Sequence, residues 1–513
     1  MYKPHITTGL QDGLRPTERG HAGSLANAGV RRKTNEVMQL KNALTQIPGL
    51  RYMVDRLNLK SGPGVRVLMA TPFMVKTDEV KEQLQQLELT VNALLDKASK
   101  PVLAKVATKL SLVRDIAGTV KNIQKKLTLN DIELFELKSS ALVAHEIRGL
   151  LKSIGFLQRR IPDLHEVIAL LDPENSGVPS FYINNAFDPR LDPLRKQLAK
   201  VELSLEKMES DAKEVDKDSL YSQSDALRAE ITAIEDGVRQ NLSERLRGYH
   251  WEINAAIVAL AGIDILIAKG NQAIADKLTK PEIVATSTSY IGLFNPQIKE
   301  LLEKENRHFQ PIDIEIHNGT CLITGANMAG KTVLLKTLAL SQALCQFGFF
   351  VPATAAKIQP VDQILFSFAD GEAGTAGLSS YAVEMVRLNH IVHQAAFGHK
   401  LLVLIDELAR TTNPTEGRAI VGAVAKHLDN QNLKVLITTH YGGLKVQCRK
   451  LRVKGFREDI GDAKITPNNI GDFIDYSLVE DDGVNVPHEA LRIAKILGVD
   501  EEIVKQAEKL LDK

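Results

Sequence analysis

The chain has 513 residues, 44% hydrophobic and 25% charged, with 64 Lys and Arg residues and 63 Asp and Glu residues. This composition excludes a disordered or collagen-like chain, and a net charge of +1 gives no overall attraction to nucleic acid. The start of the sequence lacks a secretory signal pattern, and no uninterrupted apolar run approaches the roughly 20 residues of a membrane-spanning helix, so we expect a cytoplasmic protein without membrane association. Three cysteines are too few and too scattered for a disulfide framework or a metal site: Cys321, Cys345 and Cys448.

The first predicted elements are a polar arm and a short helix, which together cover residues 1–49. Residues 1–34 are polar and rich in glycine, without periodicity. Apolar residues recur at helical spacing from about Asn35, and Pro48-Gly49 ends this helix.

Helical patterns dominate residues 50–280, where we expect an all-α part of the chain. From Thr77 to about Leu171 one amphipathic helix follows another. A break at residues 172–177 is followed by a short strand-like segment, residues 178–184.

A second helical run extends from about Leu194 to Lys277. Its apolar residues fall at three- and four-residue spacing without a sustained heptad repeat, which argues against a coiled-coil filament. We therefore expect a long antiparallel helical arm that goes out and returns.

The hydrophobic pattern of the sequence changes near residue 281, where strand-like apolar runs begin to alternate with helical segments. Such alternation predicts a largely parallel sheet with helices on both faces. We expect an α/β domain over residues 281–460, completed by helices in residues 461–513. The strand-like runs are Pro311–Ile316, Thr320–Thr324, Ile364–Phe368, Leu401–Ile405 and Val435–Thr439.

A complete phosphate-binding loop, GxxxxGK[ST], follows the second of these strands and opens a helix. Its glycines allow backbone N–H groups to turn toward phosphates, helped by the positive end of the helix dipole. We expect Lys331 to reach the β- and γ-phosphates of ATP and the Thr332 hydroxyl to bind Mg²⁺. The expected nucleotide-binding residues of the loop are Gly325, Ala326, Asn327, Met328, Ala329, Gly330, Lys331 and Thr332.

Two further strand ends carry candidate catalytic residues. The apolar run Leu401–Ile405 leads into Asp406 and Glu407, and we expect Asp406 to hold Mg²⁺ and Glu407 to act as the base that orients the attacking water. A third apolar strand runs into His440, which can sense the γ-phosphate. Together with Lys331, these residues are predicted to carry out ATP hydrolysis.

The segment Gly371–Met385 is rich in glycine and small hydroxyl residues before a helix. Ser379 and Ser380 lie where a helix starts, so they could cap it. They could equally present N–H and O–H groups to a phosphate on a neighbouring subunit.

In order and spacing, TGANMAGKT, the Gly371–Met385 segment, LLVLIDELARTTNPTEG and LITTHY resemble the motifs of the MutS family of ABC-type ATPases. The resemblance covers about residues 50–513 and is most specific in the ATPase half. It implies a helical core and lever domain over residues 50–280, an ABC-type P-loop ATPase domain and dimerising helices at the C-terminal end. It also implies a dimer, of identical or related subunits, in which Ser379 is offered to the partner's nucleotide.

The sequence departs from the family pattern at several motif positions. Ala326 and Ala329 lie in the phosphate loop, and Ala409 stands where the family has Gly. Glu416 replaces an Asp, and Leu378 replaces an Arg, which puts in doubt how the opposite subunit is signalled. None of these changes removes a group needed for ATP hydrolysis.

Family members that read mismatches carry further domains ahead of the core. Here about fifty residues precede it and contain no Phe, so we do not expect mismatch reading by an inserted aromatic. The clamp at the end of the lever is also reduced, to about residues 196–250, which hold nine Lys or Arg and twelve Asp or Glu, a balance of −3. An acidic lever tip has the wrong sign for contacts to DNA phosphates.

Two kinds of partner remain open. The first interpretation is a protein-remodelling ATPase, because the size and domain loss resemble the ATPase subunit of the factor that reactivates cobalamin-dependent lysine or ornithine aminomutases. The alternative is a mismatch-repair-type or recombination-related protein that binds double-stranded or branched DNA. A purely scaffolding, degenerate member is the third option, which the intact Lys331, Asp406 and Glu407 disfavour.

One stretch could bind nucleic acid. Residues 100–126 contain seven basic residues and only Asp115 as an acid. This run lacks interleaved aromatic residues and would lie in the core domain, so a solvated helix face explains it better than a nucleic-acid patch does. Arg31-Arg32-Lys33 has the same two explanations.

Overall fold

The computed structural model of this protein describes residues 38–207, 214–325, 329–368, 380–430, 432–457, 465–466, 469–481 and 489–511. The residues from Met38 onward form one compact unit. The polar arm predicted for residues 1–34 lies outside the described residues. The short helix predicted at its end is found as α1, Leu40–Gln46, which begins later than the expected Asn35.

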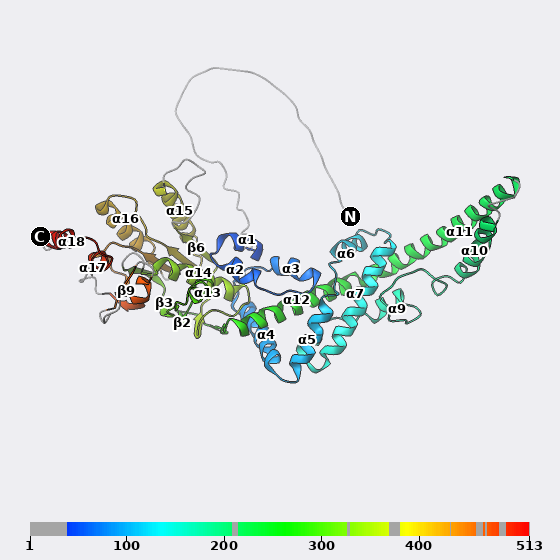
Figure 1. Cartoon of the computed structure of the whole chain (residues 1–513), viewed down its shortest axis with the longest axis horizontal. Helices are drawn as coiled ribbons and strands as arrows, with labels where there is room; N and C mark the ends of the chain where they lie inside the picture. Colours follow the sequence, from blue (N-terminus) through cyan, green and yellow to red (C-terminus); the bar gives the residue numbers. More distant parts are fainter. Residues whose placement is uncertain are drawn as a thin grey trace, which may run out of the picture. The chain divides into compact units, whose positions relative to one another are not determined.

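The part of the chain before residue 281 is helical, as predicted (Figure 1). Its described residues form no β-strand, only two isolated bridges, between Gln39 and Pro72 and between Thr279 and Val351 of the α/β part. The helices after α1 are α2 (Leu50–Asp55), α3 (Gly62–Met69), α4 (Thr77–Leu95), α5 (Ser99–Leu110), α6 (Ala117–Gln124), α7 (Asp131–Leu150), η1 (Leu151–Ser153), α8 (Gly155–Gln158), α9 (His165–Leu171), α10 (Leu191–Lys207), α11 (Glu214–Leu246), η2 (Arg247–Tyr249) and α12 (His250–Ala275).

Helix α12 is the central element of the helical part. Helices α3, α4, α5, α6 and α7 all pack against it. The continuous helical stretch Lys217–Ala275 contains a window apolar enough to cross a membrane by length and composition, but 72% of that window is buried inside the protein. Burial of this extent is what a core helix requires, so the apolar character of α12 is explained by packing.

A buried carboxylate on α12 organises the start of α3. Asp264 is 1% exposed and accepts hydrogen bonds from the backbone N–H of Lys60 and from both the N–H and the hydroxyl of Ser61. A Cβ at Gly64 would lie 2.8 Å from its Oδ2 atom, so only glycine fits beside this carboxylate. The contact joins two segments that are about 200 residues apart in the sequence.

A buried ion pair joins α7 to the loop after α9. The ammonium of Lys138 lies 3.0 Å from Asp172 Oδ1, and the two side chains are only 6% and 3% exposed. Asp172 also accepts hydrogen bonds from the Ser176 hydroxyl and the Gly177 N–H. These bonds hold the pKa of Asp172 at about 2 against the opposing effect of burial.

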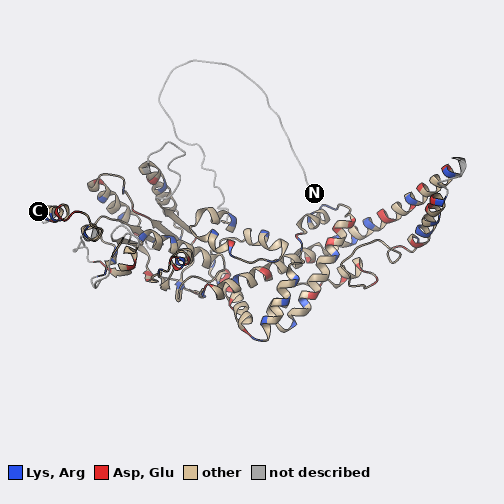
Figure 2. Ribbon diagram, viewed as in Figure 1, with Lys and Arg blue, Asp and Glu red and all other residues tan. Residues whose placement is uncertain are grey.

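Helices α10 and α11 form the antiparallel arm that the periodicity predicts. Ion pairs of 2.7 Å join Arg195 to Glu235 and Arg228 to Glu202. Later residues of α10 thus pair with earlier residues of α11, so the two helices are antiparallel. Residues 208–213, between the two helices in the sequence, lie outside the described residues. Basic and acidic side chains are mixed along the arm (Figure 2).

The strand-like segment at residues 178–184 is not a strand, so this prediction was wrong. Its backbone finds no strand to pair with, and the carbonyl of Ile183 instead accepts a hydrogen bond of 2.8 Å from Arg195. The Ile183 side chain enters a small hydrophobic cluster with Leu191, Ile231 and Ile234 at the root of the arm. The apolar residues Phe181 and Ile183 therefore serve packing against α10 and α11.

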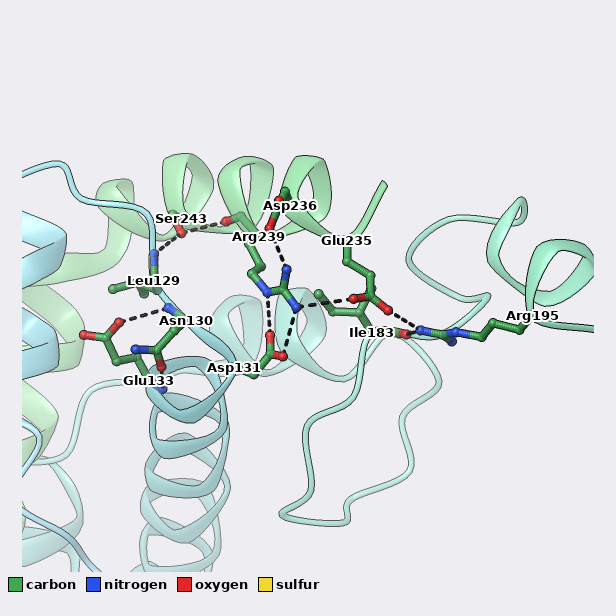
Figure 3. A network of polar contacts seen from close by, with 10 residues as sticks. All are labelled: Leu129, Asn130, Asp131, Glu133, Ile183, Arg195, Glu235, Asp236, Arg239 and Ser243. Atoms are coloured by element: carbon green, nitrogen blue, oxygen red, sulfur yellow. Dashed lines mark hydrogen bonds and ion pairs between the residues drawn. The ribbon is translucent and has the colours of Figure 1, made fainter. Parts of the chain in front are cut away.

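A polar network fixes the root of the arm to the start of α7 (Figure 3). Arg239 of α11 donates two hydrogen bonds to the carboxylate of Asp131, at 2.7 and 3.0 Å, and one of 2.7 Å to Asp236. One turn further on, the buried Ser243 hydroxyl accepts from the Leu129 N–H and donates to the Arg239 carbonyl. The arm is thus anchored by both a charged and a buried neutral contact.

The part after residue 281 is α/β, as predicted, with two sheets instead of one. A six-stranded sheet has the order β10-β9-β4-β8-β7-β6 and is parallel except for the β9–β10 pair; a four-stranded sheet has the order β1-β5-β2-β3. The strands are β1 (Glu282–Ile283), β2 (Thr288–Leu293), β3 (Ile312–Ile316), β4 (Gly319–Thr324), β5 (Ala355–Ile358), β6 (Gln363–Ser367), β7 (Leu401–Ile405), β8 (Leu433–Thr438), β9 (Arg449–Phe456) and β10 (Ile474–Glu480).

Helices accompany these strands, and two of them stand at the C-terminal end. All the strand-like runs predicted between residues 311 and 439 correspond to strands of the two sheets. The helices are α13 (Pro296–Lys304), α14 (Lys331–Gln346), α15 (Ser380–Ala395), α16 (Pro414–His427), η3 (Ile470–Phe473), α17 (Glu489–Ile496) and α18 (Glu501–Leu511).

The helical and α/β parts share one hydrophobic core. A single cluster of buried residues includes Leu50 of α2 and Leu340 of α14, and Leu340 packs against the left-handed Gly49. At the far end of α14, the Gln346 side chain donates to the Met74 carbonyl at 2.7 Å, and the Met74 N–H donates to the Gln346 carbonyl at 2.9 Å. The boundary predicted near residue 281 is therefore a change of secondary structure within one compact unit.

A buried lysine links the two parts at the same place. Lys269 of α12 donates hydrogen bonds to the carbonyls of Phe347 and Gly348, at 2.7 and 3.2 Å, and lies 3.8 Å from the ring centroid of Phe349. Burial lowers the pKa of Lys269 to about 7. These carbonyls directly follow α14, so the lysine satisfies acceptors that the end of a helix leaves without partners.

Candidate functional site

The predicted phosphate loop lies between β4 and α14, at the carboxyl end of a parallel strand. Gly325 has φ +148° and Gly330, the N-cap of α14, has φ +74°, which are conformations that favour glycine. A Cβ at Gly330 would also lie 3.0 Å from the ring of Tyr476. Ala329 and Gly330 are described, whereas Ala326, Asn327 and Met328 lie outside the described residues.

Lys331 and Thr332 open helix α14. The Lys331 side chain turns back over the loop, and its ammonium donates a hydrogen bond of 2.7 Å to the Gly325 carbonyl. Lys331 is only 4% exposed, so its ammonium charge is held beside Gly325, the first residue of the loop. The position suits an anion placed against the N-terminus of α14.

Asp406 connects the phosphate loop with two neighbouring strands. Its Oδ2 atom accepts a hydrogen bond of 2.7 Å from the Thr332 hydroxyl, and its Oδ1 atom accepts one of 2.7 Å from the Thr438 hydroxyl. The Asp406 N–H donates to the Ser367 carbonyl of β6. Asp406 is 7% exposed, so the carboxylate is fixed by three elements of the sheet and by α14.

Glu407 lies beside Asp406 in a strained segment of backbone. Glu407 has φ +48° and Ala409 has φ +59°, a left-handed conformation that costs a residue other than glycine roughly 1–2 kcal/mol. The Glu407 N–H donates a hydrogen bond of 2.8 Å to the Thr438 hydroxyl, and the Glu407 carboxylate pairs with Arg410 at 2.7 Å. Strain of this kind collects at functional sites and persists only where the surroundings enforce it.

His440 follows β8 and is exposed at the same edge of the sheet. Partial burial lowers its pKa below the ordinary value; the carboxylate of Glu407 opposes this, while the positive charges of Lys331 and Arg410 add to it. The imidazole is therefore neutral at neutral pH. His440 is therefore close enough to Lys331 and Glu407 for their charges to act on it, and its role in hydrolysis stays a prediction.

Ser379, predicted to act across a dimer, lies outside the described residues. Helix α15 begins at the next residue, Ser380, which agrees with a position at a helix start. The residues brought together in the described part of the site are Gly325, Ala329, Gly330, Lys331, Thr332, Asp406, Glu407 and His440.

The oxygens of Thr332 and Asp406 are ligands of the kind that a magnesium ion prefers. Mg²⁺ prefers oxygen ligands, and in phosphate-transfer sites it takes only one or two from the protein and the rest from phosphates and water. Among the described residues, no group of three or more His, Cys, Asp or Glu could hold a metal by itself. The donor set is therefore suited to a metal that arrives together with a nucleotide.

Four further residues contribute to the site although the sequence analysis gave them no role. Thr438 bridges Asp406 and Glu407, Arg410 pairs with Glu407, and the Tyr441 hydroxyl donates to the Ala409 carbonyl at 2.9 Å. Glu384 of α15 accepts a hydrogen bond of 2.8 Å from the Ala409 N–H. All four lie within the motif segments quoted in the sequence analysis, and this membership is the signal that could have pointed to them.

Comparison with known proteins gives one family match, to MutS domain V over residues 321–513. The chain is 26% identical to the DNA mismatch repair protein MutS of Myxococcus xanthus over 491 residues, which cover 92% of this chain and 52% of that protein. It is 24% identical to the DNA mismatch repair protein MutS of Persephonella marina over 521 residues, covering 91% of this chain and 58% of that protein.

A third relative is similar only in the C-terminal part. Endonuclease MutS2 of Caldicellulosiruptor saccharolyticus is 34% identical over 214 residues, which cover 41% of this chain and 26% of that protein. The chain thus spans less than two thirds of the length of each of these relatives. The α/β fold after a helical part agrees with the match to MutS domain V.

Proposed function

We propose that this chain is a Mg²⁺-dependent ATPase of the MutS type that works as a dimer and acts on DNA. The observation that carries the proposal is the set of hydrogen bonds that joins Thr332, Asp406 and Thr438 at the mouth of a glycine-rich loop capped by Lys331. The match of residues 321–513 to MutS domain V supports the same function.

Each residue of the site has a role in this proposal. Lys331 and the backbone of the loop bind the β- and γ-phosphates, and Thr332 with Asp406 holds Mg²⁺, which neutralises developing charge on the phosphates. Glu407 orients the attacking water and accepts its proton. The neutral ring of His440 contacts the γ-phosphate. This contact is lost when the γ-phosphate leaves.

Dimerisation is assigned to two surfaces. Ser379 would complete the partner's nucleotide site, as the family resemblance implies. The second surface is on α18, where Ile503 is 61% exposed and Leu510, two turns later on the same face, is 73% exposed, while Val504 packs inward. Large exposed apolar side chains at this spacing are typical of a helix that packs against another helix.

Replacing Ile503 by glutamate is expected to weaken the dimer by at least about tenfold, because burying such a side chain is worth about 1.5–3 kcal/mol. Sedimentation velocity over a range of protein concentrations measures the effect. The matched control is Glu508→Ala, which changes an exposed charge on the same helix and should leave the dimer intact. Equal association of both variants would show that this face of α18 is not the interface.

DNA is the proposed partner because two relatives that align with more than nine tenths of this chain are named DNA mismatch repair proteins. The basic run of residues 100–126 provides cations for phosphates: Lys121, Lys125 and Lys126 are all exposed. The arm cannot take this role easily, since Arg195 and Arg228 are already paired with carboxylates. We therefore place the DNA contact on α6 and the residues that follow it.

The test measures ATP hydrolysis of the full chain with and without duplex and branched DNA, at several salt concentrations. We expect stimulation by DNA, with an affinity that falls steeply as salt rises. The double variant Lys121→Glu, Lys125→Glu should weaken binding and lower the salt slope by about two, one for each lost phosphate contact. The matched control, Lys196→Glu with Lys200→Glu on α10, should bind like the unchanged chain.

A protein client is the second candidate, favoured by the excess of acidic residues on the arm, twelve against nine basic ones between residues 196 and 250. None of the relatives reported above is named for a reactivating factor of cobalamin enzymes, so that specific client has no support from them. If no DNA changes the ATPase rate at any salt concentration, and arm variants abolish the cellular function, the protein-client function replaces the DNA function.

A further inference from the structure

The two left-handed residues of the candidate site, Glu407 and Ala409, need an external support. L-amino acids rarely adopt φ values of +48° and +59°, so this segment relaxes unless its neighbours hold it. Glycine would adopt the conformation of Ala409 freely, yet this chain has alanine there. The supporting contacts therefore decide where the Glu407 carboxylate lies.

Three hydrogen bonds hold the segment, from β8, from the residues that directly follow β8 and from α15. At its first residue, the Glu407 N–H donates to the Thr438 hydroxyl of β8 at 2.8 Å. At its last residue, the Ala409 carbonyl accepts from the Tyr441 hydroxyl at 2.9 Å, and the Ala409 N–H donates to the Glu384 carboxylate at 2.8 Å. Ala409 is fully buried, so neither bond can be replaced by a bond to bulk water.

Glu384 is the only one of these supports that comes from α15. Glu384 is half-buried, and burial raises its pKa above the ordinary value, against the effect of the bond from Ala409. The bond joins residues 25 positions apart and connects the helix after the Ser379 segment with the loop that carries the proposed base. A shift of α15 would therefore move Ala409, and with it Glu407.

We propose that Glu384 is a positioning residue for ATP hydrolysis: its carboxylate holds the backbone of Ala409 and thereby places Glu407 against the attacking water. The proposal rests on the proposed ATPase function. Among the described contacts, Glu384 touches neither Lys331 nor Thr332, so it acts through Ala409 and contributes nothing to nucleotide affinity. It also gives α15, the helix preceded by the serine of the predicted trans contact, a direct connection to the hydrolytic residue.

The test compares steady-state hydrolysis and nucleotide affinity in three variants. Glu384→Ala should lower kcat by about tenfold to a hundredfold, as expected for a small displacement of a reacting group, with KM within about twofold of the unchanged chain. Glu384→Gln should keep most of the rate, because its amide oxygen can accept the same hydrogen bond. Adding Ala409→Gly to Glu384→Ala should restore part of the rate, since glycine adopts the left-handed conformation without support.

Glu303→Ala is the matched control, because it removes an exposed carboxylate of α13 whose ion pair is with Lys299, at 3.9 Å, and it lies outside the motif segments. A Glu384→Ala variant with the kcat of this control would overturn the proposal. So would a Glu384→Gln variant as slow as Glu384→Ala, since the charge and not the hydrogen bond would then matter.

A second readout does not depend on hydrolysis. Hydrogen exchange at the Ala409 amide should be faster in Glu384→Ala than in Glu384→Gln, because the former lacks an acceptor for this N–H. If the unchanged chain does not hydrolyse ATP, the proposed function fails but this difference in exchange remains. Equal exchange in the two variants would refute the hydrogen-bond support by itself.

Discussion

Glu407→Gln is expected to lower the rate of ATP hydrolysis by about 10²–10⁴-fold, the usual contribution of a positioned acid–base group, and to leave ATP binding intact. Glutamine has the same size, and the backbone N–H of residue 407 can still donate to Thr438. The variant loses the proton acceptor and the ion pair with Arg410. Single-turnover hydrolysis and equilibrium ATP binding in Mg²⁺ measure the two effects separately.

The same variant should hold the ATP-bound dimer long enough for its partner to be recovered. We would purify it from its native cells with ATP and Mg²⁺, with and without nuclease. A nuclease-sensitive complex that contains DNA supports the proposed function, and a nuclease-resistant complex with one abundant enzyme supports the protein-client alternative. A Glu407→Gln variant that hydrolyses ATP within tenfold of the unchanged chain would refute the role of Glu407 as the base.

Lys138→Met is expected to destabilise the folded chain by about 3–5 kcal/mol, the usual cost of removing one partner of a buried ion pair. The substitution leaves Asp172 in the interior with only Ser176 and Gly177 as hydrogen-bond donors. Urea denaturation at neutral pH measures the loss. The control is Lys109→Met, whose partner Glu146 lies 2.8 Å away but is half exposed, so less than about 1 kcal/mol should be lost.

The stabilisation by Asp172 should also depend on pH. Because its folded pKa is lowered to about 2 from 3.8, the unfolded chain binds a proton first as the pH falls. The contribution of Asp172 is therefore complete above pH 3.8 and is lost as the pH falls toward 2.

The buried pair has a refuting outcome as well. If the free energy of unfolding of Lys138→Met is no lower than that of Lys109→Met, the buried pair of Lys138 and Asp172 contributes no more stability than the exposed pair.

The sequence was informative wherever a local pattern determines structure. Alternating strands and helices after residue 281, and the glycines at both ends of the phosphate loop, are local features, and the strand runs fall where they were expected. The roles of Asp406, Glu407 and His440 remain predictions, although their side chains gather where those roles require. Each of these residues follows a parallel strand, and the carboxyl ends of neighbouring parallel strands meet at one edge.

Contacts between strands and distant helices could not be predicted in this way. Thr438 meets Asp406 because β7 and β8 pair with Ile405 opposite Ile437, a register that no short segment of sequence determines. The bond from Ala409 to Glu384 depends on how α15 packs, which the local pattern does not reveal. The strand prediction for residues 178–184 was wrong because their apolar side chains Phe181 and Ile183 pack against the arm instead of joining a sheet.

The core shared by the two parts has a consequence for how such a chain can change over evolution. Leu340 on the helix of the phosphate loop packs on Gly49, and Lys269 on α12 holds the end of the same helix. A recombination event that exchanged everything after residue 281 for the corresponding segment of a distant relative would separate these partners and leave both halves with unmatched surfaces. The α/β half is thus distinct in its sequence pattern but not in its packing, and inheritance should keep it together with the helices that precede it.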